Sequence, residues 1–360
     1  MPSPPSDPFS ALRDLPLNSF RPEPALRVPV TSVERFRFPA VDAHNHLGRW
    51  LTKRWAARDV GLLLARMDDA NVAAIVNLDG MWGAELEANL ARYDRAHPGR
   101  FATFAQLDWR EVDAGSGFGE RLAAGVRDAI DRGAKGLKVW KNLGLHLRDG
   151  GGKLLMPDDP RLTPVWEACA AGRIPVTIHT ADPIAFFEPL TPRNERVEEL
   201  LENPEWWFGD RSRFPRFERL MERFEHLVAE NPRTTFIGAH VGGCAEDVAW
   251  VARMLDTYPN LNVDIAARLA ELGRQPRAAA ALFRRHPRRI LFGTDQFPPS
   301  LATYRAYARF LETADEYFPY SPGEPPGQGR WAVSGLELPD TVLRKVYHDN
   351  ALRLIPGSRG

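Results

Sequence analysis

The sequence predicts an α/β fold, a single-domain (β/α)₈ barrel, and two observations carry this prediction. Eight short apolar runs alternate with eight amphipathic stretches between residues 40 and 313, a pattern typical of parallel strands joined by helical crossovers. Titratable residues end the first, fifth, sixth and eighth runs. A closed ring of strands brings all four ends to one mouth, whereas an open sheet brings together only the strands at its switch point.

The strands and helices follow one another in order along the chain. Residues 72–78 are largely apolar, as expected of a strand buried on both faces. Asp59 precedes a stretch that places Val60, Leu63, Leu64 and Met67 on one face, so we expect it to cap a helix. The expected strands are 40–47, 72–78, 101–107, 134–140, 175–180, 234–241, 261–266 and 290–294, and the later helices are 85–96, 120–132, 163–171, 217–230, 246–257, 277–285, 302–313 and, outside the barrel, 340–354.

Two kinds of segment lie outside this repeat. Residues 1–38 are rich in proline and show no periodicity, so we expect an extended N-terminal arm, with the barrel and its C-terminal helices filling 39–360. The connections 143–160, 182–213 and 315–339 are longer than a barrel needs, and the first two fall on the catalytic face of this fold. The aromatic residues of the second connection either shape a substrate pocket or pack on one another.

Composition argues against several classes of function. Lys plus Arg and Asp plus Glu number 47 each, so charge gives no reason to expect nucleic acid or an anionic membrane as partner. No run of about 18 apolar residues is present, and the Pro- and Ser-rich start lacks the apolar core of a secretory signal. With only two cysteines, the chain is expected to lack a disulfide framework and to work in a reducing cytoplasm. We expect its partner to be a small-molecule substrate, and a homodimer is the common default for its assembly.

The first predicted strand ends in the strongest chemical signal, the sequence V-D-A-H-N-H over residues 41–46. Residues i and i+2 of a strand point to the same face, so His44 and His46 are expected to aim together into the barrel mouth. Two imidazoles side by side suit Zn²⁺ or a similar divalent ion. The alternative is a chance H-x-H in an ordinary loop.

Three further strands also end in a titratable residue, namely His179, His240 and Asp295. At the carboxyl end of a barrel strand such a residue indicates a catalytic role. Each one alone is equally well explained as a capped or solvated strand end. Four coincidences on strands one, five, six and eight favour a metal site over four separate accidents.

Together these motifs resemble the amidohydrolase superfamily, and in particular the amidohydrolase-related branch that includes aminocarboxymuconate semialdehyde decarboxylase and several lactonases. The resemblance implies one divalent ion, with Zn²⁺ preferred and Mn²⁺ the alternative, held by His44, His46, His179 and Asp295. It also implies that His240 orients or polarises the metal-bound water or the substrate. In hydrolytic members the aspartate at the position of Asp295 takes the proton from that water.

Three further residues are expected to meet the substrate. Lys138 and Trp140 lie on the fourth strand, where binuclear members of the superfamily carry a carbamylated lysine that bridges two metals. We favour one metal with Lys138 as a positive substrate-binding group, the alternative being a lysine paired with a barrel carboxylate such as Asp264. Trp140 is expected to line the pocket or fill the barrel wall. Arg268, just past the seventh strand, is expected to bind substrate oxygen anions or to form an ion pair between loops.

Three functions follow from this reading. The sequence favours a hydrolase that cleaves the C–O or C–N bond of a lactone, ester or amide in a small anionic or hydroxylated substrate. The alternative is metal-dependent, non-oxidative decarboxylation of a small unsaturated or aromatic acid, although many aromatic-acid lyases of this branch resemble Glu-x-His rather than His-x-His on strand one. The third, a non-catalytic binding protein on a relict barrel, is disfavoured because all five site residues are present.

Overall fold

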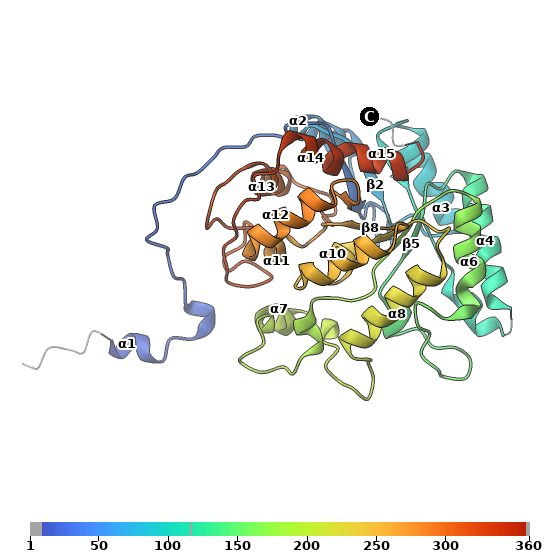
Figure 1. The fold of residues 1–360 in the computed structure, drawn as a ribbon, viewed down its shortest axis with the longest axis horizontal. Coiled ribbons are helices and arrows are strands. Elements are labelled where there is room, and N and C mark those ends of the chain that lie inside the picture. Colours follow the sequence, from blue (N-terminus) through green and yellow to red (C-terminus); the bar gives the residue numbers. More distant parts are fainter. Residues whose placement is uncertain (1–8, 116, 358–360) are drawn as a thin grey trace, which may run out of the picture.

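The computed structural model describes residues 9–115 and 117–357, in which short parallel strands lie at the centre and helices pack around them (Figure 1). One sheet has the order β1-β2-β3, with bounds Ala40–Asn45, Val72–Asn77 and Phe101–Thr103. The other runs from β4 to β9 in chain order, with bounds Ala105–Gln106, Leu137–Val139, Val176–Ile178, Phe236–Gly238, Leu261–Asp264 and Ile290–Leu291. Every strand pair in both sheets is parallel.

Backbone hydrogen bonds join the two sheets at both seams. The N–H of Phe104, between β3 and β4, donates to the carbonyl of Asn77 at 2.9 Å. At the other seam the N–H of Ala43 donates to the carbonyl of Phe292, just past β9, at 3.0 Å. The third predicted strand is therefore real but interrupted at Phe104. Eight strand positions close into a ring, and the predicted (β/α)₈ barrel is confirmed.

The helices lie where the amphipathic stretches predict them. The Asp59 side chain accepts a hydrogen bond from the N–H of Leu62 and so caps α2, as its position in the sequence indicates. The helices that surround the barrel are α2 Val60–Ala70, α3 Gly83–Leu90, α4 Phe118–Arg132, α6 Thr163–Ala171, α8 Phe217–Glu230, α10 Val248–Thr257, α12 Pro276–Arg285 and α13 Leu301–Glu312. The C-terminal helical stretch comprises α14 Asp340–Arg344, η7 Lys345–Asp349 and α15 Asn350–Leu354. No helix in the described part of the chain is long and apolar enough to cross a membrane.

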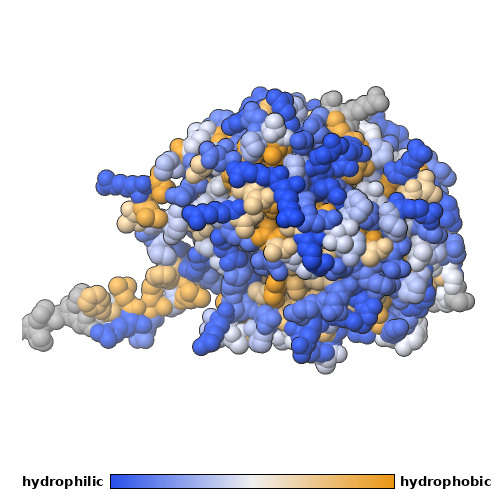
Figure 2. Space-filling model, in the orientation of Figure 1, coloured by the Kyte–Doolittle hydropathy of each residue, from blue (hydrophilic) through white to orange (hydrophobic). Residues whose placement is uncertain are grey.

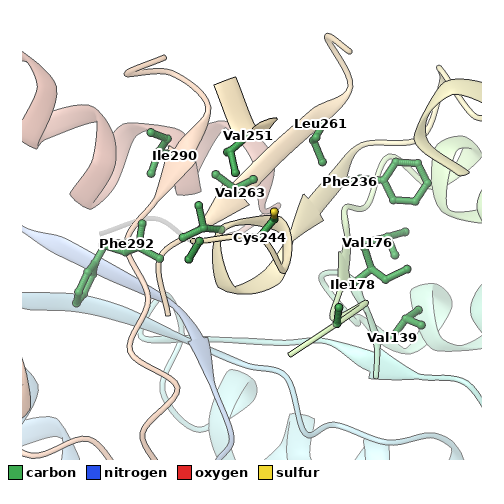
Figure 3. Close-up of a cluster of buried hydrophobic side chains, with 14 of the residues drawn as sticks. Val139, Val176, Ile178, Phe236, Cys244, Val251, Leu261, Val263, Ile290 and Phe292 are labelled. Carbon is green, nitrogen blue, oxygen red and sulfur yellow. The ribbon is translucent and has the colours of Figure 1, made fainter. Parts of the chain in front are cut away.

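Two layers of apolar side chains hold the barrel together. Val41 and Ile237 come from strands that are not neighbours in the ring yet belong to one buried cluster, which therefore fills the barrel interior. Ile355, after α15, joins the same cluster and helps to close one end of the barrel. A larger cluster packs the strands against the surrounding helices, and Figure 3 shows part of it, including Val263 of β8 and Val251 of α10. Burial of this apolar area is the main stabilising contribution, at roughly 25 cal/mol per Å².

Ahead of β1 the chain runs as an arm, much of which stands clear of the barrel (Figure 1). From residue 9 onward it holds only α1 Ser10–Arg13 and η1 Leu17–Ser19. Arg330 tethers it by donating to the carbonyl of Leu17 at 2.8 Å, and the Thr31 hydroxyl donates to Asp315 at 2.7 Å. Large apolar side chains are exposed along it, namely Phe9, Leu12, Leu15, Leu17, Phe20, Leu26 and Val30. Figure 2 shows orange, hydrophobic atoms along this projecting segment.

The long connection after β6 contains η5 Ile184–Phe187, α7 Val197–Glu202 and η6 Pro204–Trp206. Its aromatic residues pack largely on one another, with ring centroids 5.3 Å apart for Phe187 and Phe208. For these two rings the structure therefore supports packing on one another, the second of the two roles expected for the aromatic residues of this connection. One cation meets the cluster, because Lys141 Nζ lies 5.5 Å from the ring centroid of Phe208.

Candidate active site

The two histidines of the first strand are buried where β1 ends, and their ring centroids are 5.5 Å apart. His44 Nδ1 lies 2.8 Å from Asp264 Oδ2. Because an ionised carboxylate only accepts hydrogen bonds, Nδ1 carries the proton and Nε2 keeps its lone pair. A carboxylate that fixes the tautomer of a histidine in this way is typical of metal-binding imidazoles. His44 is therefore prepared to bind a metal through Nε2.

Asp264, the last residue of β8, connects two parts of the site. Besides binding His44, its Oδ1 accepts the backbone N–H groups of His240 at 2.9 Å and Ala266 at 3.1 Å. Burial acts to raise the pKa of this carboxyl, but His44 and these hydrogen bonds outweigh burial and hold the pKa below its ordinary value. Asp264 thus stays ionised. It makes no ion pair with Lys138 among the described residues, so the alternative that pairs the two is not supported.

His240 and His179 supply the second pair of imidazoles. His240 follows β7 in the left-handed region, at φ 58°, and its Nδ1 lies 2.9 Å from the carbonyl of Ala266, which leaves Nε2 as the free acceptor. A non-glycine residue held at positive φ is uncommon and tends to occur at functional sites. The ring centroid of His240 is 4.7 Å from that of His44 and 4.3 Å from that of His179.

His179, directly after β6, is held by a partner that the sequence did not single out. Its Nε2 lies 3.1 Å from Asp182 Oδ1, and the other oxygen of Asp182 forms an ion pair with Lys141. The proton therefore sits on Nε2 and leaves Nδ1 of His179 free. Burial acts to raise the pKa of Asp182, but Lys141 and His179 outweigh it and hold that pKa far below its ordinary value. The spacing of three residues between His179 and Asp182 is the only local signal for this contact.

Asp295 follows β9, also at positive φ, and its backbone N–H donates to the carbonyl of His44 at 2.8 Å. Its Oδ1 lies 3.2 Å from His46 Nε2 and 3.7 Å from His44 Nε2. Burial acts to raise the pKa of Asp295, but His44 and His46 outweigh it and hold the pKa below the ordinary value. The Asp295 side chain is 25% exposed whereas that of His44 is fully buried, so Asp295 is the more open of the two.

These residues fit a divalent ion by chemistry and by position. Burial lowers the pKa values of His46 and His179 to about 4 and that of His240 well below its ordinary value, so all three rings are neutral near pH 7. One ligand atom from each of His44, His240 and Asp295 lies within 4.8 Å of the others. His46 Nδ1 is buried and has no hydrogen-bond partner. Neutral imidazoles beside an ionised carboxylate are a donor set that Zn²⁺ and Mn²⁺ both accept.

The tightest group is therefore not quite the set expected from the sequence. His240, expected to orient water or substrate, falls in it with His44 and Asp295. His46 lies against Asp295, and His179 lies against His240. All five predicted residues thus meet at one end of the barrel.

The substrate-binding candidates of strand four line the same end. Lys138, on β5, is buried, and its Nζ lies 3.4 Å from His44 Nε2. Burial lowers the pKa of Lys138 to about 8. The Trp140 ring stacks on His46 with the ring centroids 4.7 Å apart, and the ring centroid of Trp50 lies 4.8 Å from that of Trp140. Trp140 thus forms an aromatic wall of the site, and Trp50 is a wall residue that sequence reasoning missed.

Comparison with known proteins places the chain. The family model of the amidohydrolases matches residues 41–357, and no curated protein matches the chain in sequence. Among solved structures, a 2,6-dihydroxybenzoate decarboxylase from Rhizobium is 17% identical, with a TM-score of 0.53 over 88% of this chain and 98% of that one. A dihydroxybenzoic acid decarboxylase from Polaromonas sp. JS666, with bound manganese and the inhibitor 2-nitroresorcinol, is 15% identical, with a TM-score of 0.55 over 90% and 98%. A 5-carboxyvanillate decarboxylase from Sphingomonas paucimobilis is 15% identical, with a TM-score of 0.51 over 88% and 98%.

At these identities the likeness to solved structures establishes the fold, while the family match extends over most of the chain and includes every residue of the site. Members of this family are metal-dependent enzymes, in agreement with the buried group of imidazoles and a carboxylate at the barrel mouth. The chain belongs to the amidohydrolase family.

Proposed function

We propose that this enzyme decarboxylates, without oxidation, a small aromatic or unsaturated carboxylic acid, and that His44, His46, His179 and Asp295 hold its divalent ion. The observation that carries the proposal is Lys138, a buried cation with no ion-pair partner among the described residues, beside these ligands. A buried charge without a partner is costly, so an anionic substrate is the natural complement. Three solved proteins of similar fold are named as decarboxylases of aromatic acids, which favours this reading over the hydrolase favoured by the sequence.

The aromatic wall supports the same class of substrate. The Trp50 ring, 39% exposed and 4.8 Å from that of Trp140, offers a partly open aromatic face beside the stack of Trp140 on His46. Planar conjugated acids bury their rings well against such a face, because offset stacking adds about 0.5–1.5 kcal/mol to the burial of apolar area. Lys138 Nζ lies over the Trp140 ring, 5.1 Å from its centroid, so a planar acid bound beside these rings would have the cation close by.

The reaction needs a proton at the carbon that loses CO₂, and a residue of the chain can carry it there in two transfers. The bond between the substrate carbon and its carboxyl carbon breaks, CO₂ leaves, and the electron pair left on the substrate carbon takes up a proton. Asp295, ionised and partly exposed, would accept a proton from an acidic group of the substrate and deliver it to that carbon. His240, whose Nδ1 donates to Ala266, would accept a hydrogen bond at Nε2 from an acidic group of the substrate. A bound divalent ion would supply Lewis acidity toward the substrate oxygens.

Hydrolysis of a lactone, ester or amide is the second candidate, and one observation favours it. Asp295 has its pKa held low, so it is a carboxylate prepared to accept a proton at the start of a reaction. A hydrolase uses such a group as the base for water. In that case Asp295 would act first on water rather than on an acidic group of the substrate.

A two-panel assay tests the proposal. The metal-loaded full chain is offered dihydroxybenzoates, benzenedicarboxylates and muconates with CO₂ release as readout, and lactones, esters and amides with acid release as readout. Asp295→Asn serves as the control for contaminating activity and is expected to lose at least about 10²-fold in rate. CO₂ from one or more acids, lost in the variant, supports the proposal. Hydrolysis without CO₂ release, or no turnover in either panel, rejects it.

A further inference from the structure

Three cationic side chains are buried in the part of the chain that the structure describes, Lys138, Arg196 and Arg268, and their surroundings differ. Arg196 Nη1 lies 2.6 Å from Glu199, and its Nη2 contacts Glu271. Lys138 lies among the metal-ligand candidates. Arg268, only 5% exposed, forms no ion pair with any described residue. The ion pair between loops, one of its two expected roles, is therefore absent from the described part of the chain.

The contacts of Arg268 leave most of its guanidinium unused. Nη1 donates to the neighbouring Ala267 carbonyl at 2.9 Å, and Gln328 donates to that same carbonyl at 3.2 Å. The other nitrogens of Arg268 make no hydrogen bond with the described residues, and they are not among the side-chain atoms sealed from solvent. One edge of a buried guanidinium thus faces accessible space. That edge presents N–H donors in the fork geometry that matches a carboxylate.

This edge belongs to the catalytic end of the barrel. Arg268 follows β8 by four residues, and the intervening segment carries the contacts of Asp264 with His44 and of Ala266 with His240. The charge of Arg268 is near enough to help lower the pKa of His240. Among the described residues no hydrogen bond or ion pair joins Arg268 to the four proposed metal ligands or to His240. Arg268 is therefore beside the reacting centre rather than in it.

We infer that Arg268 binds a second acidic group of the substrate, one that is retained in the product, so that the enzyme acts on a small dicarboxylic acid. The inference rests on the proposed decarboxylation. The reacting carboxylate loses its negative charge as CO₂ forms, so a cation paired with it would stabilise the ground state more than the transition state. A cation on a retained carboxylate keeps its interaction throughout and positions the substrate. Arg268 is thus a specificity residue, distinct from the ligands.

Binding of unreacted probes tests this independently of turnover. Phthalate, isophthalate and terephthalate are titrated calorimetrically into the metal-loaded full chain, with benzoate as the monocarboxylate reference, and the recovered probes are checked by chromatography so that only unreacted ones are compared. In the unsubstituted protein at least one dicarboxylate is expected to bind about tenfold or more tightly than benzoate. Arg268→Gln should remove that advantage and change benzoate affinity less than about threefold, and Arg268→Lys should restore part of it. Arg277→Gln, on an exposed arginine of α12, should leave all affinities unchanged.

A thermal unfolding measurement separates recognition from a structural role. Because Arg268 is buried without an ion-pair partner, Arg268→Gln is expected to leave the Tm unchanged or to raise it. The inference is overturned if the unsubstituted protein binds every dicarboxylate no more tightly than benzoate. It is also overturned if Arg268→Gln weakens the binding of benzoate and of the dicarboxylates equally and lowers the Tm. Failure of CO₂ release with an intact Arg268-dependent preference would instead reject the proposed reaction alone.

Discussion

The role of Asp264 in preparing His44 leads to a prediction with a magnitude. In Asp264→Asn the amide oxygen can still accept the backbone N–H groups of His240 and Ala266, which preserves the loop. The amide NH₂ then faces His44 Nδ1, where the carboxylate oxygen stood at 2.8 Å. Two donors cannot share a hydrogen bond, so the proton of His44 has to move to Nε2, the nitrogen needed for the metal.

The expected loss follows from the bond that is removed. A hydrogen bond to a charged group contributes about 1.5–3 kcal/mol, which corresponds to roughly 10- to 150-fold in affinity. Partners of metal-binding histidines usually cost about 10–100-fold when changed, in the same range. We therefore expect metal affinity, measured by competition with a chelating indicator, to fall by one to two orders of magnitude.

A matched control exists elsewhere in the chain. Asp158 also contacts a histidine, His226 Nδ1 at 3.0 Å, on α8 outside the site. Asp158→Asn should leave metal affinity unchanged. If Asp264→Asn bound the ion within about twofold of the unsubstituted protein, the argument that Asp264 sets the tautomer of His44 would be refuted.

Three further predictions follow. The purified chain should carry about one divalent ion by elemental analysis, and His44→Ala/His46→Ala should carry none; about two ions would contradict the single-metal reading. Gly293→Ala should lower the free energy of unfolding by about 1–3 kcal/mol and should also weaken metal binding, because a Cβ there would lie 2.9 Å from the Cβ of His44. Gly150→Ala, where a Cβ would have no atom within 4 Å, should change neither quantity. Burial raises the pKa of Asp79 from 3.8 to about 7, so the native state holds this proton more tightly than the unfolded chain does. As the pH rises from about 4 to about 7, the free energy of unfolding of the unsubstituted protein, measured by chemical denaturation, should therefore fall relative to that of Asp79→Asn. A constant difference between the two proteins over that range would contradict this.

Local patterns were sufficient for the repeating part of the fold. The buried strands and amphipathic helices of the barrel follow from periodicities of two and 3.6, which the chain shows within each segment; α6 and α8 have the expected bounds. The interruption at Phe104 was not foreseeable in this way. The N–H of Phe104 still donates to Asn77 of β2, whereas the next residue, Ala105, pairs with Leu137 of β5, and local sequence does not record where the strand is interrupted between these two neighbours.

In the candidate site, too, some features could be predicted from local sequence and others could not. That His44, His46, His179, His240 and Asp295 meet could be predicted, because each ends a strand and a barrel gathers strand ends. Their partners could not. Asp264 ends a strand in the same manner, yet nothing near it in the sequence indicates that it holds a ring 220 positions away. Hydrogen-bond partners are chosen by three-dimensional proximity, which local sequence does not record.

By itself, the sequence determined the class of fold, the face of the barrel that carries the chemistry and the residue types that suit a divalent ion. Only the tertiary structure decided which nitrogen of His44 and of His240 keeps its lone pair, that Asp264 and Asp182 stay ionised beside their histidines, and that Arg268 is buried without forming an ion pair with a described carboxylate. The physical reason is that tautomer, ionisation and pairing depend on burial and on contacts between distant segments, and these exist only once the chain has closed into a barrel.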